Sequence, residues 1–122
     1  MSIHFSLKER IEARYADALA GSPELKQDAL LLTLTNDVAL EVRFAARDEY
    51  SIAWQWGDAL LRIDTAPFHP GLATYPNHLH DADGKVRADP LTATERDPGE
   101  NLCAVLDALL KDPLLESVGY AE

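Results

Sequence analysis

The fold is decided by residues 38–64, which read VALEVRFAARDEYSIAWQWGDALLRID. Within this run, apolar and polar residues alternate in three stretches, which is the pattern of β-strands that bury one face. The stretches are residues 38–46, 50–56 and 60–64. Short polar turns separate them, and connections this short join antiparallel neighbours. Together with the apolar run of residues 29–35, they predict a four-stranded antiparallel meander.

An amphipathic helix is predicted on each side of these strands. The first follows a Ser-x-x-Glu capping box at residues 6–9, keeps apolar residues at helical spacing, and ends at the Gly-Ser-Pro of residues 21–23. The second begins at Asp97, an N-cap followed by proline, and ends before Pro113. Both helices have one apolar side that needs a partner surface.

This order of elements predicts an α+β fold, in which an antiparallel four- to five-stranded sheet has the N-terminal and the C-terminal helix packed on one face. Residues 85–87 are the candidate fifth strand, at an edge. Leu114 and Leu115 are expected to dock on the core, and residues 117–122 to form a frayed tail. The length of 122 residues, without a linker-like segment, predicts a single domain over residues 1–122.

Charge and composition restrict the function classes. The net charge of −10 at pH 7 repels polyanions and opposes nucleic-acid binding. The single cysteine, Cys103, permits no intrachain disulfide and is expected to be a small buried hydrophobe. No apolar run is long enough for a membrane span, and the first residues lack the regions of a signal peptide. We therefore expect a cytoplasmic protein.

Aromatic residues gather on one face of the predicted strand of residues 50–56. Tyr50, Trp54 and Trp56 share that face with Ile52. We expect a buried core cluster, and the stacking of unpaired bases on these rings is the open alternative.

Chemically capable residues concentrate in residues 62–81, which read RIDTAPFHPGLATYPNHLHD and which we call the His/Pro segment. It contains three of the four histidines of the chain and three prolines. Arg62 and Asp64 share one face of the strand that enters the segment. His78 and His80 form an H-x-H pair, whose rings would share a face if these residues were extended. With His69, these four residues are the candidate site.

Three interpretations of this site stay open. Two imidazoles and a guanidinium can cleave RNA without a metal, with His69, His78 and His80 as acid and base candidates, Arg62 as charge stabiliser and Asp64 as the group that orients a ring. A divalent metal held by His78 and His80, with His69 and with Asp64 or Asp81 completing the site, is the second interpretation, and no other cofactor is expected. The third is a structural loop, braced by prolines, in which histidines satisfy buried backbone groups.

The His/Pro segment resembles the signature segment of the TumE-type toxin family of toxin–antitoxin systems. The residues that match the family pattern are Asp64, Ala66, Pro67, His69, Pro70, Thr74, Pro76, His78 and His80. The sequence departs from the pattern at Thr65, Phe68, Asn77 and Leu79. The flanking strands and the terminal helix are also similar, so that the resemblance covers roughly residues 38–111.

This resemblance implies a toxin component that a cognate antitoxin neutralises, with an endoribonuclease-like activity on an RNA substrate. The alternative function is a non-enzymatic module that binds a protein partner, or a second copy of itself as a homodimer. The negative charge and the departures from the family pattern favour the alternative.

Overall fold

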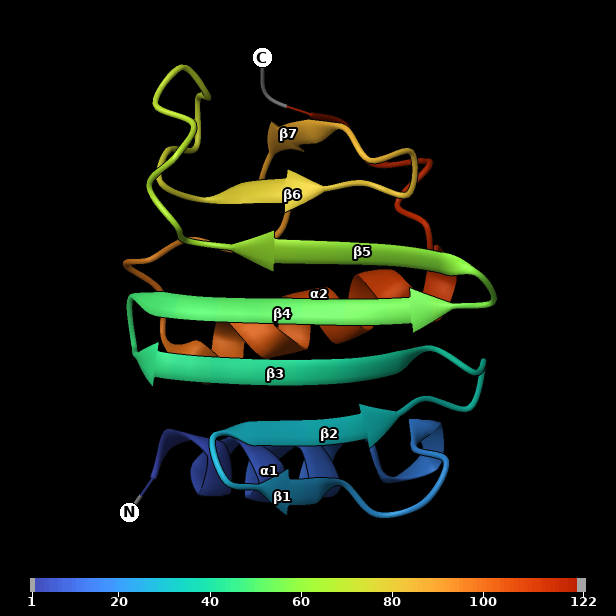
Figure 1. The fold of residues 1–122 in the computed structure, drawn as a ribbon. Coiled ribbons are helices and arrows are strands. Elements are labelled where there is room, and N and C mark those ends of the chain that lie inside the picture. Colours follow the sequence, from blue (N-terminus) through green and yellow to red (C-terminus); the bar gives the residue numbers. More distant parts are fainter. Residues whose placement is uncertain (1, 121–122) are drawn as a thin grey trace.

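A computed structural model describes residues 2–120 of the chain. In chain order (Figure 1), the elements are the helix α1 (Ile3–Arg14), the 3₁₀-helix η1 (Ala16–Ala18), the strands β1 (Glu24–Lys26), β2 (Ala29–Thr33), β3 (Ala39–Ala46), β4 (Glu49–Trp56), β5 (Ala59–Asp64), β6 (His78–His80) and β7 (Val86–Ala88), and the helix α2 (Pro98–Lys111). The described residues thus contain two α-helices and one sheet of seven strands.

The sheet follows the order of the chain, β1-β2-β3-β4-β5-β6-β7, and every neighbouring pair is antiparallel. The predicted α+β class and the meander at its centre are confirmed. The strand number was too low, because β1 and β6 were not predicted and β7 was the uncertain edge strand. Both missed strands have three residues, too few for an alternating pattern to be visible in the sequence.

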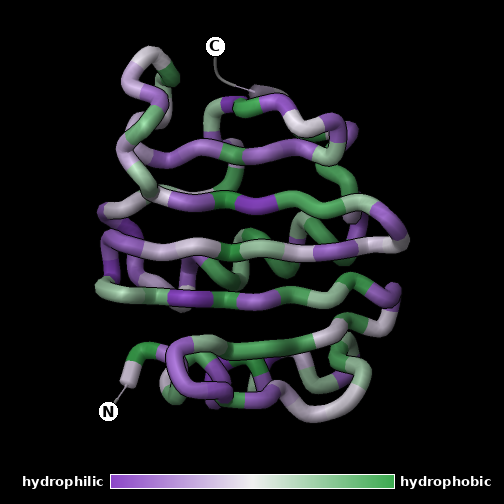
Figure 2. The backbone as a smooth tube through the Cα atoms, viewed as in Figure 1, coloured by the Kyte–Doolittle hydropathy of each residue, from purple (hydrophilic) through white to green (hydrophobic). Residues whose placement is uncertain are grey.

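Both helices cover the same face of the sheet, as predicted, and within residues 2–120 the opposite face carries no second layer (Figure 1). Along the central strands β3 and β4, buried residues alternate with more exposed ones, and the alternating colours of β3 in Figure 2 show this pattern. Buried side chains from β2 to β6 pack against those of the helices, with Ile11, Ile52 and Leu106 fully buried. The predicted aromatic core holds for Tyr50 and Trp54, whereas Trp56 is 39% exposed.

The N-cap of the first helix lies four residues before Ser6, the N-cap that the sequence predicts. Ser2 is the N-cap, and its hydroxyl accepts a hydrogen bond from the backbone N–H of Phe5 at 3.1 Å. The helix also ends early, at Arg14, because the chain turns to pair with the sheet: the N–H of Ala20 donates to the carbonyl of Thr33. In contrast, α2 starts at the predicted N-cap Asp97, whose carboxylate accepts from two backbone N–H groups.

The C-terminal segment packs back on the fold. Leu115 is 1% exposed, which confirms the predicted docking. The predicted frayed tail is wrong for residues 117–120, since Asp112 accepts hydrogen bonds from Ser117, and Arg87 lies over the ring of Tyr120. Residues 121–122 lie outside the described part of the chain. Within residues 2–120, neither helix combines the length and the apolarity that a membrane crossing requires.

Candidate functional site

The candidate site lies where β5 pairs with β6, on the sheet face that no helix covers. Arg62 pairs with His80 and Asp64 with His78 in the antiparallel register. Because side chains alternate along a strand, all four project from the same face, while Ile63 and Leu79 between them are buried on the helix side. The H-x-H pair is therefore on a strand, although the sequence placed it in a loop.

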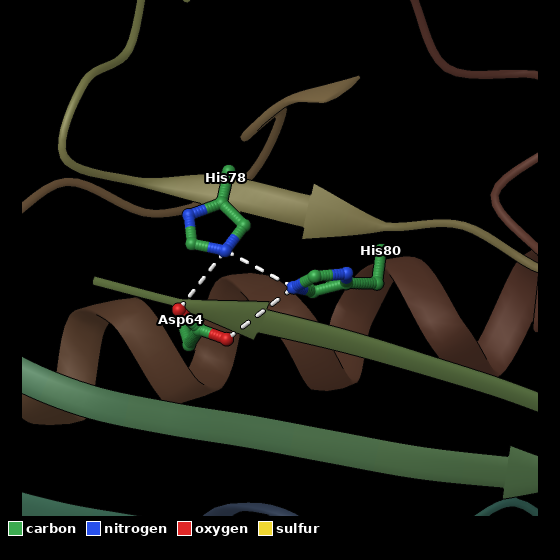
Figure 3. Close-up of side chains that lie close together, drawn as sticks. All are labelled: Asp64, His78 and His80. Atoms are coloured by element: carbon green, nitrogen blue, oxygen red, sulfur yellow. Dashed lines mark hydrogen bonds and ion pairs between the residues drawn. The ribbon is translucent and has the colours of Figure 1, made fainter. Parts of the chain in front are cut away.

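The two histidines and the carboxylate converge on one point (Figure 3). Nε2 of His78 lies 3.0 Å from Oδ1 of Asp64 and 3.1 Å from Nε2 of His80. Nε2 of His80 lies 3.6 Å from Oδ2 of Asp64. In the part of the chain that the structure describes, these three residues form the one group of ligand-type side chains whose donor atoms all lie within 4.8 Å of one another.

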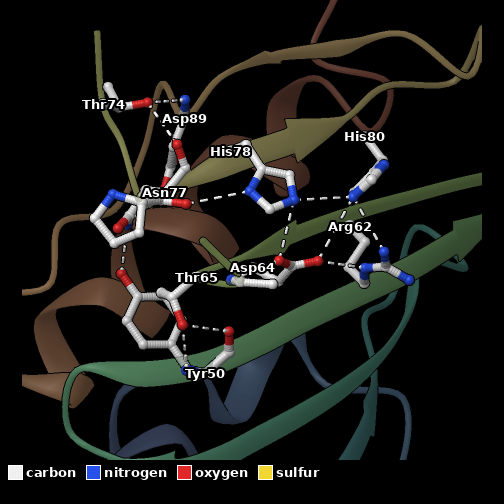
Figure 4. Close-up of polar contacts among 11 residues, drawn as sticks. Tyr50, Arg62, Asp64, Thr65, Thr74, Asn77, His78, His80 and Asp89 are labelled. Atoms are coloured by element: carbon white, nitrogen blue, oxygen red, sulfur yellow. Dashed lines mark hydrogen bonds and ion pairs between the residues drawn. The ribbon is translucent and has the colours of Figure 1, made fainter. Parts of the chain in front are cut away.

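Arg62 supplies a positive charge at the edge of this group. Its Nε donates to Oδ2 of Asp64 at 2.8 Å, and its Nη2 lies 3.0 Å from Nε2 of His80 (Figure 4). A guanidinium has donors and no acceptor, so in this contact Nε2 of His80 is the acceptor and its own hydrogen is on Nδ1. The lone pair of His80 is therefore occupied by Arg62.

His78 has acceptors at both ring nitrogens. Its Nδ1 faces the carbonyl of Pro76 at 3.2 Å, and its Nε2 faces Asp64 and the accepting nitrogen of His80. Only 2% of the His78 side chain is exposed, so these contacts hold its ring inside the protein.

His69, the remaining candidate, comes from the loop between β5 and β6. Its ring centroid lies 4.8 Å from that of His78 and 6.4 Å from that of His80. The structure thus brings together all five residues that the sequence singled out. They differ in access: 49% of the side chain of Arg62 and 32% of that of His80 are exposed, against 11% for Asp64.

The residues that could hold a metal are among those that the sequence offered. His78, His80 and the carboxylate of Asp64 form the converging group, and His69 and Asp81 are not part of it. Two histidines and one carboxylate are a known donor set for divalent iron and related ions. The hydrogen bond from Nδ1 of His78 to a carbonyl is typical of such ligands. Arg62 competes with this use, since it occupies the lone pair of His80.

The environment of His80 favours its neutral form. Burial lowers the pKa of His80 from its ordinary value, and the positive charge of Arg62 lowers it further, with Asp64 acting in the opposite direction. A histidine held neutral is able to take a proton near neutral pH.

A buried polar network fixes the chain just before His78 (Figure 4). The amide of Asn77, 3% exposed, donates to the hydroxyl of Tyr50 at 2.8 Å and to the carboxylate of Asp89 at 3.0 Å. Thr74 closes the turn by donating to the carbonyl of Asn77 and accepting from the N–H of Asp89. In the sequence, Asn77 stands out only as a departure from the family pattern. A polar residue between Pro76 and an H-x-H pair was the available signal.

A shallow hollow of about 750 Å³ opens beside the cluster. The charged and aromatic residues that line it are Arg43, Asp48, Glu49, Tyr50, Arg62, Asp64 and Tyr75. Tyr75 is 46% exposed, so its ring is available to a ligand in the hollow.

Fold and geometry define the class of this protein: it is an α+β protein that carries a cluster of histidines, a carboxylate and an arginine on an uncovered sheet face. A family model described as Toxin TumE matches residues 7–112, and the chain belongs to this family. The match confirms the resemblance that the His/Pro segment suggested. Membership supports a role as the toxin component of a toxin–antitoxin system and implies an antitoxin partner. Comparison with curated proteins gave no match, and comparison with solved structures gave none.

Proposed function

We propose that this toxin acts by cleaving RNA at the exposed side of the cluster, in the cytoplasm. The observation that carries the proposal is that two imidazoles and a guanidinium within reach of solvent lie close together. These belong to His80, His69 and Arg62, and they surround the buried pair of Asp64 and His78. Such a set supplies the base, the acid and the charge stabiliser that phosphodiester cleavage needs.

The roles follow from exposure and hydrogen bonding. A substrate phosphate draws Arg62 away from His80, which frees the lone pair of Nε2. His80 then takes the proton of a ribose 2′-hydroxyl as its oxygen attacks phosphorus, and His69 gives a proton to the departing 5′-oxygen. The products are a 2′,3′-cyclic phosphate and a 5′-hydroxyl, so protons and bonds balance. Asp64 and His78 are positioning residues, since little of their side chains is exposed.

The net charge of −10 opposes RNA binding, and three carboxylates line the hollow beside the cluster together with Arg43 and Arg62. Within the hollow, the two guanidiniums offer phosphate contacts, and the exposed ring of Tyr75 offers a base a stacking surface. Substrate is therefore expected to be single-stranded, because a duplex hides its base faces.

The test is cleavage of a labelled single-stranded RNA by the purified chain, with growth after induction as the cellular measurement. His80→Asn and His69→Asn are expected to slow cleavage by about 10²–10⁴-fold and to relieve growth arrest. His4→Asn is the matched control, because His4 lies in α1 and contacts Phe44 instead of the cluster. Equal cleavage by His80→Asn and His4→Asn would exclude the proposed role, and arrest without any cleavage would favour the non-enzymatic, protein-binding alternative.

A second candidate, metal-dependent hydrolysis, rests on the convergence of Asp64, His78 and His80 within 4.8 Å. Asp64, His78 and His80 would hold the ion once Arg62 had left the cluster, and the ion would supply Lewis-acid activation for hydrolysis of the phosphodiester by water. The two mechanisms leave different RNA ends, because attack by water gives no cyclic phosphate. Cleavage that survives EDTA and yields cyclic phosphate ends supports the first mechanism. Cleavage that EDTA abolishes and that manganese or zinc restores supports the second.

A further inference from the structure

The uncovered face of the sheet is hollowed into a groove of about 940 Å³ that runs across β1 to β5 and reaches β6. Its floor consists of outward-facing residues of adjacent strands, and at its centre these are the small side chains of Ala39 and Ala53. Leu60, which is 66% exposed, lines it as well. The groove ends at Arg62 and His80, the two most exposed members of the cluster on β5 and β6.

The chemistry of the groove suits a protein and not a nucleic acid. Apart from His80, its one aromatic lining residue is Trp54, which is 2% exposed and offers no ring for stacking. The exposed acids Glu24 and Glu41 line it, and they repel phosphate. A sheet face that presents alanine and leucine beside carboxylates instead complements a polypeptide segment with apolar side chains and with lysine or arginine.

We propose that this groove is the docking surface of the antitoxin, which lays a basic amphipathic segment across β1 to β5 and covers Arg62 and His80. Three observations support the choice of occupant. The family implies a protein partner. The net charge of −10 makes a basic partner electrostatically favourable. The groove is continuous with the cluster, since the same two residues line its end.

Neutralisation then follows from geometry. A segment in the groove buries the side chains that are expected to meet the substrate, so the toxin is inhibited without a change of its fold. This second step rests on the proposed function, whereas the location of the antitoxin does not.

The test measures binding without RNA. The probes are the purified products of the two genes that flank this one. The dissociation constant of the product that binds is measured by calorimetry for the wild type, for Ala39→Arg and for Ala13→Arg. Both alanines are exposed, and Ala13 lies on α1, away from the uncovered face. Ala39→Arg places bulk and positive charge in the groove, so affinity is expected to fall by about tenfold or more. Ala13→Arg is expected to bind like the wild type.

Hydrogen exchange of the wild-type chain provides a second readout that needs no variant. Bound antitoxin is expected to protect the backbone N–H groups of β1, at the edge of the groove, and not those in the solvent-facing turns of α1. Equal affinities of the two variants, unchanged exchange in β1, or no binding by either neighbouring gene product would each overturn the proposal. Binding that Ala39→Arg weakens, with no RNA cleavage by the free chain, would retain the docking surface and remove the proposed function.

Discussion

Asp64 and His78 lie directly opposite each other on β5 and β6, and Oδ1 of the carboxylate is 3.0 Å from Nε2 of the imidazole. Side-chain exposure is 11% for Asp64 and 2% for His78. The contact therefore lies where little solvent reaches it. The exposed residues Arg62 and His80 are held against the pair through hydrogen bonds, which makes Asp64 the centre of the cluster.

Asp64→Asn is expected to destabilise the fold. It removes the negative charge that Arg62 and His78 share, while the amide still fits the space. Hydrogen bonds to charged groups contribute about 1.5–3 kcal/mol each, and we expect a loss of about 2 kcal/mol in the free energy of unfolding. Urea denaturation of both proteins at neutral pH measures it. An unchanged midpoint would mean that the carboxylate is not a counter-charge in the folded state.

Asn77→Ala is expected to cost about 1–3 kcal/mol, because it leaves buried partners without their donor. The amide of Asn77 donates to Tyr50 and Asp89 and is followed directly by His78. We therefore also expect weaker activity, through displacement of the histidine. Tyr50→Phe is the milder comparison, since it removes the hydroxyl that contacts Asn77 and Thr92 and keeps the contact between Asn77 and Asp89. Equal stability of Asn77→Ala and the wild type in urea would contradict the network's role.

The sequence predicted the parts of the fold in which a periodic pattern is long enough to read. The alternation in β3 and β4 continues over eight residues in each strand, and α2 has an N-cap at Asp97 and a stripe of apolar residues. The first helix was misplaced because residues 6–9 match a capping box, whereas the N-cap in the structure is Ser2, which lacks that pattern. The choice of Ser2 is tied to a long-range contact, in which His4 accepts a hydrogen bond from Phe44, and no local pattern reports it.

The candidate site was predictable in its residues and not in its geometry. Residue type alone pointed to the histidines, Arg62 and Asp64. Their convergence depends on β6, a strand of three residues that exists because its backbone pairs with β5 and β7. The burial of His78 and the role of Asn77 likewise follow from long-range contacts that a single sequence does not display.

Stability is expected to fall in mild acid in a way that depends on His4. Burial lowers the pKa of His4 from its ordinary value of 6.5, Asp28 raises it and Arg43 lowers it. The neutral ring accepts the N–H of Phe44 at 3.0 Å, which protonation prevents. Because the folded pKa is depressed, the contribution is present above pH 6.5 and is lost as the pH falls through the folded value.

The measurement compares urea midpoints of the wild type and His4→Gln from about pH 8 to about pH 5, the range in which histidine titrates. Gln is able to accept the same hydrogen bond without titrating. The wild type is expected to lose at most about 1 kcal/mol relative to His4→Gln on acidification. His80 contributes a slope of the same sign in both proteins, so only the difference counts. Parallel curves would show that the His4 contact is not sensitive to pH.

Tyr75 is expected to contribute to RNA affinity through its ring. It is 46% exposed and lines the hollow beside Asp64 with Arg43 and Arg62, where a base next to the reacting phosphate would lie. Stacking on an aromatic side chain is worth about 1–3 kcal/mol per base. Tyr75→Ala should therefore weaken binding of a single-stranded RNA by that amount, whereas Tyr75→Phe should bind like the wild type. Fluorescence anisotropy in the His80→Asn background measures binding without cleavage. If both Tyr75 variants bind equally, the ring does not stack on a base, and the hollow is not part of the path of the RNA.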